Sequence, residues 1–217
     1  MEAVKGRDAE LASAVLATAR AMNASGINRG SAGNVSARCA GGFIITPTGM
    51  AYDACTPADM VKVGADGTVS GSRTPSSEWR FHRDIYVARP EAGAVVHSHS
   101  PFATALACQG QGVPAFHYMV ARFGGSDVRC AAYATFGTQE LSDAVMKALK
   151  GRNACLMAHH GMLVFGRDCE QALALAVELE TLCEQYWRVL QLGAPRLLPD
   201  AEMKRVLAKV AGYGQQG

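Results

Sequence analysis

The chain has 217 residues, enough for one domain with a substantial core, and we expect a single domain over residues 1–217. The 21 Lys and Arg against 19 Asp and Glu give a net charge of +2 without any basic run, so neither nucleic acid nor an anionic membrane is an expected partner. No apolar segment approaches the length of a membrane span, and the first 13 residues lack the apolar core of a secretory signal. The seven cysteines form no CxxC pair, which favours reduced thiols in a cytoplasmic protein.

The helical segments are marked by apolar residues at helical spacing and by boundary residues. Gly26 ends the first, Pro90 stops the second, and Asp168 is the expected N-cap of a long amphipathic helix that ends at Gly193. The expected helices cover residues 8–24, 76–89, 101–110, 138–151 and 168–193, with a short helix in the tail at 201–217.

Short β-rich runs separate these helices. They lie near 34–38, at 43–46, in a hairpin around 66–67, at 92–100, at 128–137, and at 154–166, where two apolar pieces are pinched around 159–161. Strands and helices mix without strict alternation. The sequence therefore predicts an α/β protein with a central, mostly antiparallel sheet covered by helices.

The stretch "AVVHSHS" places His97 and His99 two residues apart at the end of an apolar run. In an extended strand these two imidazoles point to the same side. A third imidazole is available in "AHHGM", from His159 or His160, and three histidines with an open fourth position are one form of a catalytic zinc site. The alternative is a pair of ordinary polar residues at a strand end and a histidine in a turn.

Three polar segments offer groups that bind anions. In "PSSEWRFH", Ser76 and Ser77 lie where a helix is expected to begin, with Glu78 in its first turn. The loops "SAGNVS" and "TPTGM" add hydroxyl, amide and backbone donors, without the pattern of a P-loop. Taken singly, each is equally explained as a turn, and an acidic residue in a first turn is equally explained by the helix dipole.

The motifs taken together, in their order, resemble a known family. From Ala19 to Tyr213 the chain is similar to class II aldolases of the L-fuculose-phosphate aldolase type, in the aldolase/epimerase family that shares its fold with the adducin head. The matching segments are "GSAGNVSAR", "ITPTGM", "PSSEWRFH", "AVVHSHS", "HYM", "YATFGTQELS" and "HHGML".

The resemblance implies roles for individual residues. His97, His99 and His160 would hold one Zn²⁺ ion per subunit, His160 being chosen because the family's ligand directly precedes Gly. Glu78 would be the acid/base group beside the metal and would close its vacant position when substrate is absent. The residues implied in binding the substrate phosphate are Asn34, Thr48, Gly49, Ser76 and Ser77.

Two tyrosines complete the implied site. Tyr118 would reach into the site of a neighbouring subunit as proton donor to the aldehyde oxygen, and Tyr213 in the tail would be a second active-site tyrosine. Active sites at subunit interfaces imply a homo-oligomer, and the family precedent is a cyclic homotetramer.

The implied reaction is the retro-aldol cleavage of a ketose 1-phosphate to dihydroxyacetone phosphate and a small aldehyde, an aldehyde-lyase activity that needs no catalytic lysine. The candidate substrates are L-fuculose 1-phosphate, 5-deoxyribulose 1-phosphate and 5-methylthioribulose 1-phosphate. Residues 121–128 ("ARFGGSDV") and the tail are expected to shape the pocket for the aldehyde half.

Other members of the fold provide the alternatives. An L-ribulose-5-phosphate 4-epimerase would carry Asp in place of Glu78 and Lys-Pro-Ser in place of residues 46–48. A non-enzymatic adducin-like domain would lack metal ligands. A sugar-acid phosphate decarboxylase and a methylthioribulose-phosphate dehydratase are more remote alternatives.

Overall fold

The computed structural model describes the backbone of residues 2–210 and the side chains of residues 6–210. Its strands form one eight-stranded sheet in the order β4-β3-β2-β1-β5-β8-β7-β6. All neighbouring pairs are antiparallel except β6 and β7, which run parallel. The predicted fold class is therefore confirmed. The strands are β1 (Asn34–Cys39), β2 (Gly42–Ile45), β3 (Val61–Gly64), β4 (Val69–Ser70), β5 (Ala94–Ser98), β6 (Arg129–Ala131), β7 (Ala154–Met157) and β8 (Gly161–Gly166).

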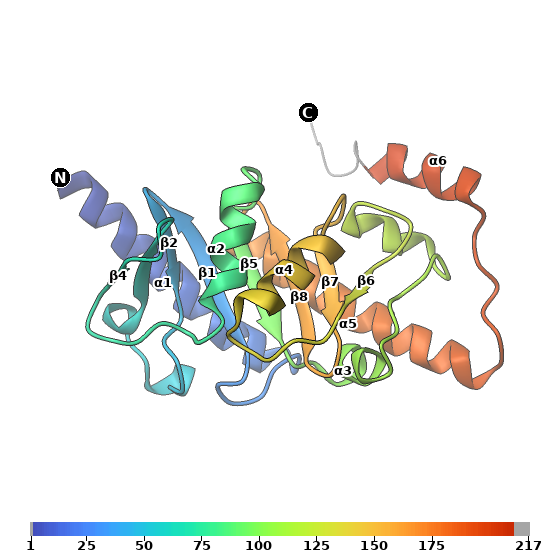
Figure 1. Ribbon diagram of the computed structural model, residues 1–217, viewed down its shortest axis with the longest axis horizontal. Helices are drawn as coiled ribbons and strands as arrows, with labels where there is room; N and C mark the ends of the chain where they lie inside the picture. The colour runs from blue at the N-terminus through green and yellow to red at the C-terminus, as the bar shows by residue number, and fades with distance from the viewer. Residues whose placement is uncertain (1, 211–217) are drawn as a thin grey trace.

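Helices cover both faces of this sheet. Figure 1 shows α2 and α4 in front of the strands and α1 and α5 behind them, while α6 lies to one side, where it contacts η3. Within residues 2–210, no helix has the length and apolar character needed to span a membrane. The α-helices are α1 (Glu2–Ala24), α2 (Trp79–Ala88), α3 (Pro101–Cys108), α4 (Gln139–Ala148), α5 (Cys169–Gln191) and α6 (Asp200–Val210), and the 3₁₀ helices are η1 (Tyr52–Ala54), η2 (Pro57–Asp59) and η3 (Tyr118–Phe123).

The central strand β5 contributes to two hydrophobic cores. Successive strand residues point to opposite faces, so Ala94 and Val96 pack under α1 and α5, whereas Val95 packs under α2 and α4. Burial on both faces explains why this strand is a continuous apolar run in the sequence. His97 follows Val95 on the face that α2 covers, where its ring contacts Phe81 edge-on.

Three predicted boundaries are wrong. The first helix, expected over 8–24, begins at Glu2. The helix expected to begin near Ser76 begins at Trp79, because the Ser76 N–H donates to the carbonyl of Thr46 at 3.0 Å and keeps this segment extended. The strand expected over 128–137 is only the three-residue β6, because its partner β7 ends at Met157, opposite Ala131. The predicted N-cap of α5 is confirmed: the Asp168 carboxylate accepts from the Gln171 N–H at 2.8 Å.

A buried carboxylate anchors α3 directly behind the end of β5. Glu180 of α5 accepts from the Ser100 hydroxyl at 2.7 Å and from the N–H groups of Phe102 and Ala103 at 2.8 and 2.9 Å. These N–H groups belong to the first turn of α3, where intrahelical partners are lacking and the helix dipole favours an anion. The chain leaving His99 is thereby held in place.

We expect Glu180→Gln to lower the free energy of unfolding by about 1–3 kcal/mol, because the amide turns an NH₂ group toward donors. Urea unfolding at matched protein concentration measures the change. The matched control is Glu178→Gln on the same helix, whose part-exposed pair with Arg122 at 3.3 Å contributes at most about 1 kcal/mol. Equal losses in the two variants would contradict the anchoring role of Glu180.

Candidate metal centre and active site

Three imidazoles meet where the paired strands β5 and β8 end and begin. His97 is in β5, His99 follows that strand, and His160 directly precedes β8. Because β5 pairs with β8, the end of one strand lies beside the start of the other. The Nε2 atoms of His97 and His99 are 3.1 Å apart, and one ring nitrogen from each of the three histidines lies within 4.8 Å of the others. The three predicted histidines thus form a group that can hold a metal ion.

The hydrogen bonds around this group leave lone pairs directed at its centre. His97 Nδ1 lies 2.8 Å from the Met162 carbonyl, which only accepts, so Nδ1 carries the hydrogen and Nε2 of the neutral ring is a free ligand. The Glu78 carboxylate adds two oxygens, Oε2 at 3.1 Å from His97 Nε2 and Oε1 at 3.1 Å from His160 Nε2. Glu78 Oε1 is buried without a hydrogen-bond partner among the described residues. Imidazole nitrogens and carboxylate oxygens that converge in this way fit a divalent cation of the kind that imidazole binds.

The ionisation of these groups is strongly coupled. Burial opposes the charge on Glu78, but the adjacent His97 and His160 outweigh burial and hold the pKa of the carboxyl well below its usual range. Burial also opposes the charge on His97, but Glu78 raises the pKa of that ring. Burial, together with the other two imidazoles, lowers the pKa of His99 to about 4. The site therefore holds an anionic carboxylate beside imidazoles that do not all become charged together.

Glu78 occupies the N-cap position of α2 without capping it. Its φ and ψ are −97° and 11°, and its carboxylate forms no capping hydrogen bond with the helix N–H groups. The carboxylate lies against His97 and His160 instead, which helix capping does not require. Asn34 of β1 donates from Nδ2 to Glu78 Oε2 at 3.0 Å and thereby holds the carboxylate toward the histidines.

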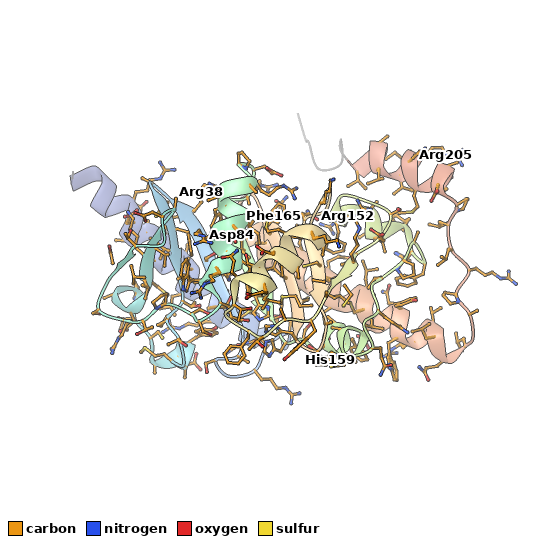
Figure 2. All side chains as sticks on the ribbon, viewed as in Figure 1. Arg38, Asp84, Arg152, His159, Phe165 and Arg205 are labelled. Atoms are coloured by element: carbon orange, nitrogen blue, oxygen red, sulfur yellow. The ribbon has the colours of Figure 1, made fainter. Side chains whose placement is uncertain are left out.

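Two glycines allow the backbone segments to approach closely at this edge. A Cβ on Gly33 would lie 2.5 Å from the His97 carbonyl oxygen, and a Cβ on Gly161 would lie 2.5 Å from the Ser98 carbonyl oxygen. His159, labelled in Figure 2 at the edge of the sheet, has a left-handed φ of 55°, and its side chain is exposed. The tight turn thus separates the two adjacent histidines: His160 joins the group and His159 lies at its mouth.

The two loops expected to bind phosphate lie side by side. Pro47 and Pro75 form an antiparallel bridge, and the Thr48 N–H donates to the Thr74 carbonyl at 3.0 Å. The N–H groups of Gly49 and Ser77 have no hydrogen-bond partner within residues 2–210, so both remain available as donors. The Ser76 side chain is buried, whereas Thr48 and Ser77 are exposed.

Asn34 differs from the other residues expected to bind phosphate. Its amide is buried and is shared between Glu78 and His82, whose Nε2 lies 2.6 Å from Asn34 Oδ1. Asn34 therefore separates Glu78 from His82, and the direct i,i+4 contact that their spacing suggests does not form. One hydrogen of its NH₂ group is still free to donate.

A hollow of about 270 Å³ opens over the three histidines. Its floor includes Ser77, Glu78, His99 and His160, and its rim includes the exposed side chains of Tyr133, Phe136 and His159. None of the lining residues comes from 121–128, so in one chain this loop does not shape the hollow as expected.

Tyr118, one of the two tyrosines of the predicted site, lies elsewhere in this chain. Tyr118, at the start of η3, is about half exposed and lines a separate hollow with Met119, Arg122 and Leu175. Tyr213 lies outside the described residues. One chain therefore brings the histidines, Glu78 and the two loops together, but not Tyr118.

Sequence reasoning did not find the aromatic rim or the buried partners of Asn34. Tyr133 and Phe136 stand in the quoted segment "YATFG", but a loop was not expected there. Ser36, which bonds to the other side of His82, and Tyr86, which bonds to Ser36, carry no sequence signal because their strand and helix positions alone do not show that they meet.

Comparisons with known proteins identify the family of this chain. Residues 13–187 match the model of the class II aldolase and adducin N-terminal domain family. The chain is 54% identical over 196 residues to a protein of Rhodospirillum rubrum named 5-methylthioribulose-1-phosphate/5-deoxyribulose-1-phosphate aldolase, covering 90% of this chain and 89% of that one. It is 44% identical over 206 residues to the L-fuculose phosphate aldolase of Escherichia coli, covering 94% and 96%. A solved L-fuculose 1-phosphate aldolase superposes with a TM-score of 0.90 at 34% identity, over 93% of this chain and 96% of that chain. The chain belongs to the class II aldolase and adducin N-terminal domain family.

Proposed function

We propose that this protein is a zinc-dependent aldolase that cleaves a ketose 1-phosphate to dihydroxyacetone phosphate and a small aldehyde. The observation that carries the proposal is the convergence of His97, His99 and His160 with the Glu78 carboxylate, at a hollow that Glu78, His99 and His160 line. The relatives named above are aldolases of such ketose phosphates. All seven cysteines are free thiols, which supports a cytoplasmic enzyme.

The histidines would hold the zinc ion, which when bound acts as a Lewis acid toward the oxygens of the substrate and stabilises the negative charge that cleavage leaves on them. Glu78 would exchange the proton at the carbon of the dihydroxyacetone phosphate half. Asn34 holds Glu78 Oε2, whereas Oε1 has no hydrogen-bond partner and lies 3.1 Å from His160 Nε2, which would bind the metal. This arrangement suits a general acid/base, because one oxygen is fixed and the other is free to carry the proton.

The phosphate end of the substrate would lie against the paired loops. Backbone N–H groups of Gly49 and Ser77, with the hydroxyls of Thr48, Ser76 and Ser77, provide donors without a lysine or arginine. The free NH₂ hydrogen of Asn34 would add one more donor while its oxygen stays on His82.

The aldehyde end would lie under the aromatic rim. Tyr133 and Phe136 are about two-thirds exposed, and large exposed aromatic rings at the mouth of a polar hollow fit an apolar group. A 5-methylthio or 5-deoxy ketose phosphate ends in such a group. The 54% identical relative is named for these substrates, so we expect them to be preferred over L-fuculose 1-phosphate.

The proton donor to the aldehyde oxygen would come from a second copy of the chain. Tyr118 is exposed and lies outside the hollow of its own chain, as a residue that acts on a neighbour must. We therefore propose a homotetramer in which Tyr118 completes the adjacent site. Tyr213, outside the described residues, is proposed as a further active-site tyrosine.

The first test is a coupled assay for dihydroxyacetone phosphate with zinc-loaded protein. It compares 5-methylthioribulose, 5-deoxyribulose and L-fuculose 1-phosphates, each with and without a chelator. We expect chelator-sensitive release, fastest with the first two ketoses. Absence of release from all three would overturn the proposed aldolase activity, and L-ribulose 5-phosphate would then test epimerisation.

Two substitutions separate metal binding from proton transfer. His97→Ala removes a ligand, so we expect loss of bound metal and of activity. Glu78→Gln leaves the three imidazoles in place, so we expect the metal content to stay while kcat falls about 10²- to 10⁴-fold. Metal analysis and kcat are measured together, with Glu184→Gln, an exposed pair with Arg188 on α5, as the control. A Glu78→Gln enzyme with the wild-type kcat would remove Glu78 from the mechanism.

The shared site predicts complementation between two inactive variants. We expect Tyr118→Phe and Glu78→Gln homo-oligomers each to be slow, and tetramers assembled from both to recover activity, because some sites then combine an intact Glu78 with a neighbour's intact Tyr118. Light scattering should give a mass of about four 22.9 kDa chains. Mixed assemblies no more active than the sum of the two variants would place Tyr118 outside its neighbour's site.

A further inference from the structure

A line of buried polar side chains runs from Glu78 into the core between α2 and the sheet. Beyond Asn34, His82 Nδ1 lies 2.7 Å from Ser36 Oγ, which in turn lies 2.8 Å from the Tyr86 hydroxyl. Every member is less than a tenth exposed, and the His82 ring is fully buried. Buried polar groups are costly unless they are hydrogen-bonded, so a connected row of them is unlike the apolar packing around it.

The Glu78 carboxylate at one end of the row, together with a neutral His82 ring, fixes the direction of all the hydrogen bonds. A carboxylate only accepts, so Asn34 must turn its NH₂ group toward Glu78 and its carbonyl oxygen toward His82. That oxygen also only accepts, so His82 must carry its hydrogen on Nε2. A neutral ring then leaves Nδ1 bare, and Ser36 donates to it while accepting from Tyr86. The opposite direction would place the Asn34 oxygen against the carboxylate.

The surroundings of His82 restrict it to this arrangement. Its ring stacks on Phe81 with centroids 4.7 Å apart and lies nearly parallel to Phe43 at 6.3 Å. Among the described residues the two ring nitrogens bond only to Ser36 and Asn34. Burial, with the nearby His97, lowers the pKa of His82 to about 3, so the ring is neutral at ordinary pH.

We propose that His82 is a positioning residue: its Nε2–H tautomer, held by Ser36, locks the Asn34 amide so that Glu78 Oε2 is held and Oε1 stays free for proton transfer. His82 touches neither the histidine group nor the hollow. It acts through Asn34, which lies opposite His97 in the pairing of β1 with β5. The effect on rate rests on the proposed aldolase activity, whereas the tautomer and the direction of the hydrogen bonds do not.

The first test reads the tautomer directly in the zinc-loaded wild-type protein. NMR of ¹⁵N-labelled histidine distinguishes a protonated ring nitrogen from a bare one, and comparison with His82→Gln assigns the His82 signals. We expect a hydrogen on Nε2 and a bare Nδ1. A hydrogen on Nδ1, or on both nitrogens, at neutral pH would overturn the proposal whether or not the protein is an aldolase.

The second test uses two substitutions of the same ring. His82→Phe fits between the two phenylalanines but cannot donate to Asn34, so we expect kcat to fall about 10- to 100-fold with unchanged metal content. His82→Gln places an amide NH₂ near the Nε2 position, so we expect most of kcat to return. Ile85→Val, a buried substitution on the same helix outside the row, is the control for general loosening of α2.

The outcomes separate positioning from structure. A wild-type kcat in His82→Phe would overturn the proposal, as would a His82→Gln enzyme no faster than His82→Phe. A loss of metal in His82→Phe would also contradict it, because the row would then support the ligands and not Glu78. If wild-type protein releases no dihydroxyacetone phosphate, the proposed function fails, and the NMR result alone decides the assignment of His82.

Discussion

The site depends on the register of β5 between β1 and β8. This pairing sets Asn34 opposite His97 on one side and Leu163 opposite His97 on the other. Because side chains alternate along a strand, a slip of one residue would move His97 to the face under α1 and α5, away from Glu78. The same slip would turn Ser98, which is buried on the opposite face, toward α2 in its place. Val95 and Val96 pack into different hydrophobic cores, which opposes any such slip. The packing of the sheet therefore also fixes the position of His97 in the histidine group.

The orientation of α2 is the second requirement, since this helix carries His82 and Glu78 is its N-cap residue. Arg38 of β1, labelled in Figure 2, donates from its guanidinium to the carbonyls of Tyr86 and Arg89 at 2.9 and 2.8 Å. These carbonyls lie at the end of the helix, where intrahelical donors are lacking and a cation is favoured. On the other side, Asp84 accepts from the Ser142 hydroxyl of α4 at 2.6 Å. The helix that presents the acid/base candidate is thus fixed from β1 and from α4.

Much of this arrangement follows from local sequence patterns, but not all of it. The i,i+2 spacing of His97 and His99 was sufficient to predict two imidazoles on one side of a strand end. Spacing did not distinguish His159 from His160, and only the resemblance did. The structure gives the physical reason: the left-handed backbone of His159 turns its side chain outward at the tight turn before Gly161. A single residue's φ is decided by the turn that surrounds it and has no separate signature in a histidine pair.

Glu78 and His82 show a different limit. Their i,i+4 spacing suggests a direct contact on one helix, yet the helix begins after Glu78 and the Asn34 amide lies between the two. Asn34 comes from a strand 44 residues earlier in the chain than Glu78, and such a contact exists only when β1 is paired in its register. Helical periodicity contains no information about a third residue that arrives from another element.

The division between buried and exposed parts of the site explains how one fold serves relatives named for different ketose phosphates. Asn34, Glu78 and His97 are buried and share hydrogen bonds or close charge contacts, so a change in one disturbs the others. Tyr133 and Phe136 are exposed at the rim, where most substitutions change stability by no more than about 0.5 kcal/mol. The end that would hold the metal and perform proton transfer is therefore constrained by folding, while the end that would contact the aldehyde is free to vary. Substrate preference in this chain is accordingly to be sought at the rim and not at the histidines.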